Sequence, residues 1–202
     1  MKNVVVSLAV IAAAGMSASA ASFNDHASYL AATVNNVVIN FDTDPAGNPL
    51  SSGQEIGSTY AAWGAEFPAG NFVGAAVLPV SSPLCWFNDT IEDGGPRFDV
   101  KITAPDITAV GVFNVLYSQG LFQRLTAYNG GGDALAFVDA DNDINTLDFF
   151  GVTTAEPIAY VVIQFRDQYG WGVDDLHLGQ VPSPGAAVLG LMGVAAVGRR
   201  RR

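Results

Sequence analysis

The chain has 202 residues, 50% of them hydrophobic, with 19 acidic residues against 9 basic ones. All 19 acidic residues lie between Asp25 and Asp175, where only four basic residues occur, so this body carries a formal charge of −15. Nucleic-acid binding needs clustered Lys and Arg, and this charge excludes it. The single cysteine, Cys85, excludes an internal disulfide and a cysteine-rich metal site. The 22 Gly, 10 Pro and 14% charged residues favour one turn-rich β domain.

The first 20 residues are typical of a secretory signal peptide. A basic flank at Lys2 is followed by an apolar run from Val4 to Met16 and by the A-x-A site Ala18-Ser19-Ala20. The basic flank, the apolar core and the small-residue exit occur in the order of an export signal. We therefore expect residues 1–20 to be a signal peptide that is cleaved after Ala20.

Residues 21–180 are predicted to form a single ectodomain. At its start Phe23, Ala27, Leu30 and Ala31 recur at helical spacing, which predicts a short helix with Ser22 or Asn24 as its cap. Six later runs have strand length and are rich in Val, Ile, Phe and Tyr: 36–42, 97–103, 109–117, 121–128, 134–140 and 159–165.

The polarity pattern of these runs indicates how the strands pack. Between Arg97 and Thr103 apolar and polar residues alternate strictly, as expected for a half-buried antiparallel strand. Gly-rich and Asn-rich turn signals separate the runs, and no second helical segment long enough for a βαβ unit occurs. The sequence therefore predicts an all-β fold, namely an antiparallel β-sandwich of jelly-roll-like type.

Two pairs of aromatic residues are candidates for ligand binding. Tyr60 and Trp63 in one stretch, and Tyr169 and Trp171 in another, stand beside glycines at predicted loops or strand ends. Flat aromatic faces with nearby carboxylates form shallow platforms for sugars. The alternative is that each large ring fills the edge of the sandwich core.

A calcium site is a second candidate. Asp139, Asp141 and Asp143 alternate in one acidic stretch, and Ca²⁺ prefers several carboxylate and amide oxygens. The stretch lacks the Gly and Glu of an EF-hand loop, so a solvated hairpin loop is the alternative. Asp174 and Asp175 are further calcium candidates, with a role in bracing a loop as the alternative.

Nothing in the sequence selects a catalytic residue. The chain has no G-x-S-x-G elbow, no H-E-x-x-H pair and no phosphate-binding glycine loop. A glycosidase needs only two carboxylates at a set separation, and no pair stands out among the 19 acidic residues. We therefore expect a protein that is not an enzyme.

The C-terminal segment 181–202 combines an apolar run with a basic end. Val181 to Gly198 is uncharged, and as a helix its 18 residues would span roughly 27 Å, close to a hydrocarbon core of about 30 Å. The four arginines Arg199, Arg200, Arg201 and Arg202 would stay in the cytoplasm by the positive-inside rule. We expect a short transmembrane helix here, with a packed helix and a solvated tail as the alternative.

This arrangement resembles the PEP-CTERM sorting signal. Pro182, Ser183, Pro184 and Gly185 stand where the family has its Pro-Glu-Pro motif, with Ser183 in place of the acidic residue. The resemblance implies recognition and processing by an exosortase-type membrane enzyme. The alternative is a permanent single-span anchor.

Two stretches of the body resemble lectin-like and galactose-binding-like jelly rolls. One holds Gly57, Tyr60, Gly64 and Phe67, and the other holds Gly151-Val152, Pro157-Ile158 and Val173-Asp174-Asp175-Leu176. This resemblance implies the fold rather than a particular ligand.

Together these features predict an exported protein, either anchored in the membrane or processed to the cell surface or the extracellular matrix. Its expected function is non-enzymatic, with binding of extracellular polysaccharide, assisted or not by Ca²⁺. A surface glycan hydrolase and a structural coat protein without ligand are the alternatives.

Overall fold

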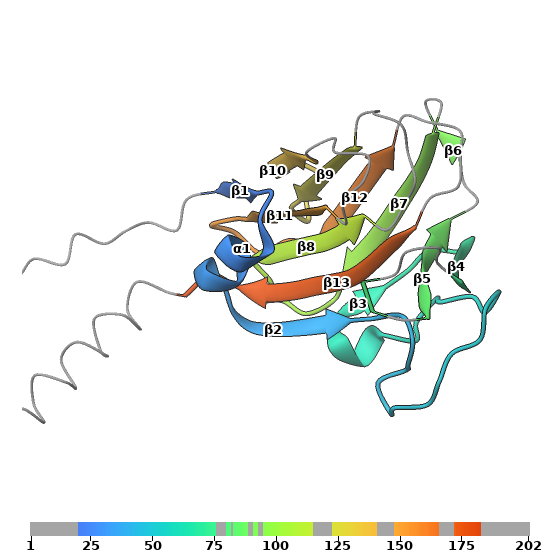
Figure 1. Cartoon of the computed structure of the whole chain (residues 1–202). Coiled ribbons are helices and arrows are strands. Elements are labelled where there is room, and N and C mark those ends of the chain that lie inside the picture. Colours follow the sequence, from blue (N-terminus) through green and yellow to red (C-terminus); the bar gives the residue numbers. More distant parts are fainter. Residues whose placement is uncertain are drawn as a thin grey trace, which may run out of the picture.

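The computed structural model describes residues 20–75, 80–81, 83–88, 91–92, 95–114, 123–140, 148–165 and 172–182 (Figure 1). These residues form one α-helix, α1 (His26–Ala32), one 3₁₀ turn, η1 (Ala61–Trp63), and strands. The strands are β1 (Ala21–Phe23), β2 (Val34–Ile39), β3 (Ala65–Glu66), β4 (Asn71–Ala75), β5 (Leu84–Asn88), β6 (Ile91–Glu92), β7 (Gly95–Ile102), β8 (Ala109–Asn114), β9 (Gln123–Tyr128), β10 (Ala134–Asp139), β11 (Phe149–Thr153), β12 (Tyr160–Phe165) and β13 (Val173–Gln180). The described fold is therefore all-β apart from one short helix.

The strands form two antiparallel sheets. The first has the order β1-β11-β8-β13-β5-β4, and β2 also pairs with β13. The second has the order β10-β9-β12-β7-β3, and β6 pairs with β7. The predicted antiparallel sandwich is confirmed at this level: two sheets, with the core between them.

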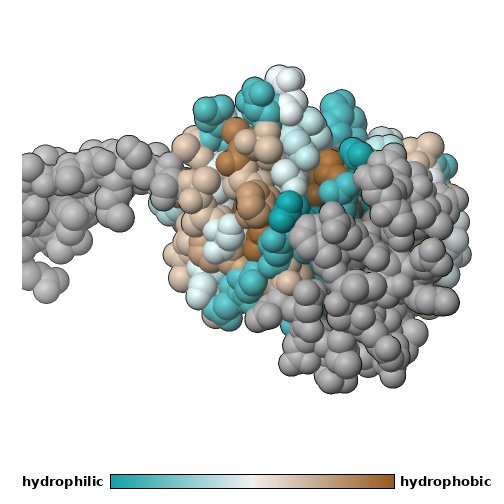
Figure 2. Space-filling model, turned by 90° about the horizontal axis from the view of Figure 1, so that it is seen from above, coloured by the Kyte–Doolittle hydropathy of each residue, from teal (hydrophilic) through white to brown (hydrophobic). Residues whose placement is uncertain are grey.

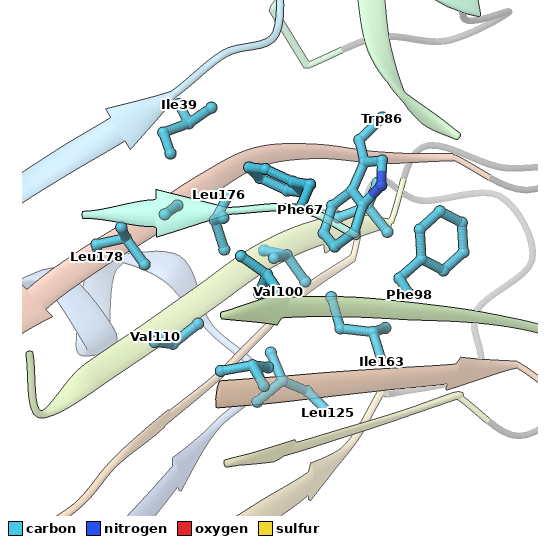
Figure 3. Packing of buried hydrophobic residues seen from close by; sticks show 14 of the residues in the cluster. Ile39, Phe67, Trp86, Phe98, Val100, Val110, Leu125, Ile163, Leu176 and Leu178 are labelled. Atoms are coloured by element: carbon cyan, nitrogen blue, oxygen red, sulfur yellow. The ribbon is translucent and has the colours of Figure 1, made fainter. Parts of the chain in front are cut away.

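The main core is built by side chains that point inward from both sheets (Figure 3). Phe98 and Val100 from β7 enter this core from one sheet, as the alternation in β7 predicted, and Leu176 and Leu178 from β13 enter it from the other. Large aromatic rings fill one end. There Trp86 lies edge-on to Phe98 and donates a hydrogen bond from Nε1 to Asn71 Oδ1 at 2.6 Å. The buried indole thus has a polar partner, as buried Trp N–H groups usually do.

A second, smaller cluster covers the outer face of the first sheet. Tyr29 of α1 packs with Ala109 and Phe149. The Phe149 ring lies over Gly111, where a Cβ would be only 2.3 Å from the ring atom Cζ. A glycine is therefore needed at position 111 so that the ring and the helix can approach the sheet.

The predicted elements agree with the structure in type but not in every detail. Six predicted strands correspond to β2, β7, β8, β9, β10 and β12. The predicted helix is α1, but its cap is Asp25, whose carboxylate accepts a hydrogen bond from Ser28 N at 2.8 Å. Ser22 and Asn24 precede the cap, and Ser22 lies in β1.

The two predicted export segments fall largely outside the described residues. Residues 1–19, including Ala18, and residues 183–202, including the apolar run and all four terminal arginines, are not described. Ala20 and Pro182 are described, and both are exposed. In the described part of the chain, no helix combines the length and the apolar character that crossing a bilayer requires.

Candidate functional site

One open pocket has Trp63 as part of its wall. Trp63 ends η1, and the turn stops at Gly64, which has a φ of 90° and lies against Ala104. The pocket has a volume of about 420 Å³. It is lined by residues of η1, of β2, of the connection between β7 and β8, and of the end of β13: Asn35, Val37, Ala61, Ala62, Trp63, Gly64, Thr103, Ala104, Asp106, Ile107 and Gln180.

The rim of this pocket is polar and internally hydrogen-bonded. Asn35 Nδ2 donates to Gln180 Oε1 at 2.7 Å, and Gln180 Nε2 in turn donates to Asp106 Oδ2. Thr103 and Asp106 are exposed. Two amides, a hydroxyl and one carboxylate thus line the pocket together with the indole ring of Trp63. This combination suits ligands such as sugars, which carry many hydroxyl groups and have flat apolar faces.

Tyr60, the other described aromatic candidate, does not line this pocket. Tyr60 is fully buried, stacks on Trp63 with 5.8 Å between ring centroids, and donates a hydrogen bond from its OH to the Thr43 carbonyl at 3.0 Å. Burial raises the pKa of Tyr60, with the charges of nearby aspartates adding to the shift. Tyr60 therefore supports Trp63 from the core and does not contact a ligand. Tyr169 and Trp171 lie outside the described residues.

The carboxylate of Asp139 already has a partner. Arg124 donates to its two oxygens, from Nε at 2.7 Å and from Nη2 at 2.9 Å. The same guanidinium lies 4.4 Å from the ring centre of Phe137, which is 53% exposed and lines two further hollows of about 440 and 340 Å³. Asp141 and Asp143 lie outside the described residues.

Arg124, Phe137 and Asp139 belong to β9 and β10, on the side of the molecule seen in Figure 2. Apolar and hydrophilic residues lie next to one another over this side rather than in separate areas.

Asp174 holds a loop against β13. Its Oδ2 accepts hydrogen bonds from the backbone N–H groups of Val80 and Ser81, both at 3.0 Å, and Oδ1 accepts from Asp175 N at 2.8 Å. The Ser81 hydroxyl lies 2.9 Å from Asp175 Oδ1 and 3.2 Å from Asp174 Oδ1. Burial, and then the charge of Asp175, raise the pKa of Asp174 to about 7. The geometry corresponds to the loop-bracing alternative.

The described residues do not assemble a cation site. Among them no group of three or more His, Cys, Asp or Glu side chains is placed to hold a metal ion. Asp139 belongs to one sheet, and Asp174 and Asp175 belong to the other. The predicted calcium ligands therefore do not come together within the described part of the chain.

The polar rim of the pocket was not predicted from the sequence. The rim residues come from three separate parts of the chain, which meet because β13 pairs with β2 on one side and with β8 on the other: Asn35, then Thr103 and Asp106, and Gln180. Asn35 has a φ of 55°, a conformation that Asn tolerates better than most residues, which is the one local signal that could have drawn attention to it.

Comparisons of the chain with protein-family models, with curated proteins and with solved structures found no match.

Proposed function

We propose that this protein is an exported, non-enzymatic component of the cell surface or extracellular matrix, and that the pocket beside Trp63 binds a neutral polysaccharide. The proposal depends on one observation: a half-buried indole ring in an open pocket with a hydrogen-bonding rim. Tyr60 supports the ring from behind, so the wall is rigid before a ligand arrives.

The charge of the body favours neutral over acidic polysaccharides. The stretch from Asp25 to Asp175 has 19 acidic and four basic residues, and Asp106 stands on the pocket rim. A polyanion would be repelled by both. The hydroxyl groups of a neutral sugar can instead donate hydrogen bonds to the same carboxylate.

The strand connections support a jelly-roll arrangement. From β7 to β13 the chain changes sheet at every connection except the β9–β10 hairpin. Such crossing between two packed sheets is characteristic of the jelly roll, a fold that many lectin domains adopt.

The proposal of surface sorting rests on the C-terminal segment 181–202. The motif Pro182 to Gly185, the uncharged run after it and the four terminal arginines suit a membrane-directed segment that an exosortase-type enzyme processes. Intact mass measurement of the protein from its native cells tests this. Loss of everything beyond about Pro184 is expected, and an intact Arg199–Arg202 end would leave a plain membrane anchor instead.

Affinity electrophoresis of the full chain in gels containing neutral β-glucan or galactomannan tests the binding. We expect retardation of the wild type, a loss of about tenfold in affinity for Trp63→Ala, and no loss for Phe137→Ala, which removes an exposed aromatic ring from another site. Equal mobility of wild type and Trp63→Ala would refute the assignment of the pocket.

The same polysaccharides, tested for retardation and for release of reducing ends, separate the alternatives. Asp106 is the only carboxylate among the described lining residues, whereas glycoside hydrolysis normally uses two. Release of reducing ends, abolished by Asp106→Asn, would identify a hydrolase. If the wild type shows no retardation and no release of reducing ends, the remaining alternative is a structural coat protein. Retardation that a chelator removes would indicate calcium, held by residues that include Asp141 or Asp143.

A further inference from the structure

The apolar side of α1 does not face the core. The helical spacing of Ala27, Leu30 and Ala31 predicts that these residues pack inward, but all three are exposed, and Leu30 retains 41% of its surface. Tyr29 is buried instead and packs on the first sheet. The helix thus presents its apolar stripe to the surroundings, which calls for an explanation because exposed apolar surface is unfavourable in water.

The next element, β2, also has exposed apolar side chains. Val34 and Val38 of β2 are 41% and 40% exposed, and α1 ends only two residues before Val34. Among the described strands β2 pairs only with β13 and so forms an edge. Three of the four large hydrophobic side chains found exposed in the described residues therefore lie on two consecutive elements.

The described part of the chain ends beside these residues. Val34 is paired with Gln180, the last residue of β13, and Pro182 follows two residues later. The end of β13, the start of β2 and α1 lie together at one end of the molecule (Figure 1). Within the uncharged run from Val181 to Gly198, the apolar part that follows the Pro-Ser-Pro-Gly motif begins at Ala186.

The short connection limits how far the domain can be from the bilayer. From Pro182 to Ala186 there are four residue steps, which span at most about 14 Å when fully extended. The headgroup region on each side of the hydrocarbon core is about 7 Å thick. The end of the domain beside Pro182 must then lie at the membrane surface.

We propose that the surface formed by Leu30, Val34 and Val38 rests on the lipid interface while the C-terminal segment is in the membrane. This inference rests on the proposed membrane-directed tail. Apolar side chains gain free energy by leaving water for the interface. Because the body is acidic, the surface suits zwitterionic rather than anionic headgroups.

Site-directed fluorescence tests this orientation. In the full chain with Cys85→Ala, single cysteines at Leu30, Val34 and Val38 are labelled with an environment-sensitive dye. Matched labels are placed at Phe137, an equally apolar exposed position on the other sheet, and at Ser51, an exposed position in the loop after β2. The protein is reconstituted into phosphatidylcholine vesicles that carry a headgroup quencher.

We expect loss of fluorescence at Leu30 and Val34, a smaller loss at Val38, which is farther from the exit, and none at Phe137 or Ser51. Equal quenching at all five positions in a chain that floats with the vesicles would overturn the orientation and leave the anchor intact. A chain that does not float would overturn both. A change in dye emission at Leu30 and Val34 that increases with protein concentration in the absence of vesicles would indicate that a second copy of the chain covers this surface. That outcome would also refute the inference.

Discussion

Protonation of His177 should make a destabilising contribution to the free energy of unfolding as the pH falls. The imidazole lies on the outer face of the first sheet and is only 4% exposed, and neither ring nitrogen has a hydrogen-bond partner within the described structure. It packs in a ring cluster with Phe149 and with His26, whose ring centre is 4.7 Å away. Burial, and then the charge of His26, lower the pKa of His177 to about 4 from its ordinary value of 6.5.

The direction and size of the effect follow from proton linkage. Between pH 6.5 and 4 the unfolded chain binds a proton at His177 and the folded chain does not, so the free energy of unfolding falls as the pH falls. A difference of 2.5 pKa units corresponds to about 3 kcal/mol, fully lost near pH 4. Asp174 acts in the opposite direction, because its raised pKa of about 7 makes the folded state bind the extra proton over the same range. The wild type alone would therefore show little net change.

Comparing the pH dependence of stability in the wild type and in a His177 variant isolates the contribution of this histidine. His177→Phe keeps an aromatic ring in the cluster and removes the titrating group, so urea midpoints of the two chains should diverge steadily from pH 7 to pH 4, in favour of the variant. Tyr160→Phe, on the other sheet, should run parallel to the wild type over this range. Parallel curves for His177→Phe would refute the reasoning, since they would mean that the imidazole is hydrated or partnered when folded.

Three further predictions concern local packing. Ser81→Ala removes the hydroxyl that bonds both neighbouring aspartates of β13 and should cost about 1–3 kcal/mol in urea unfolding, whereas an unchanged midpoint would mean that water replaces it. Gly111→Ala should cost about 1–3 kcal/mol or more because its Cβ would clash with Phe149, while Gly130→Ala, in open space, serves as the matched control and should change little. Cys85 is fully buried with a raised pKa, so Ellman's reagent should label it only at the rate of unfolding, and rapid labelling of the native protein would contradict its burial.

The strands were the most predictable part of this protein. Where one face of a strand is buried, as in β7, apolar and polar residues alternate along the sequence and can be recognised there. Strands buried on both faces carry no such pattern. All five residues of β11 are buried, because Phe150 and Val152 enter the core while Phe149 packs under α1. Such a strand shows no alternation, and it was not among the predicted runs.

The candidate pocket was only half predictable. Trp63 and Tyr60 look alike in sequence, since both are aromatic and lie near glycines. What separates them is the turn η1, which sends the Tyr60 ring into the core and leaves Trp63 half exposed. The polar rim depends on long-range pairing of β2 with β13, which no local pattern encodes.

A bulge near the start of β13 decides which of its side chains enter the core. Strict alternation from Val173 would place His177 on the same face as Val173. In the structure the register of β13 against β8 shifts between Asp174 and His177, and Asp175 has a φ of 44°. This bulge changes the parity, so Val173 and Leu176 both enter the core and His177 points outward to α1. Two consecutive aspartates inside an apolar strand were the available signal, because Asp is unfavourable in a regular strand and suits an irregular one. The same bulge positions Asp174 to brace the loop and His177 to lie beneath the helix, and thereby produces the two opposed pH effects described above.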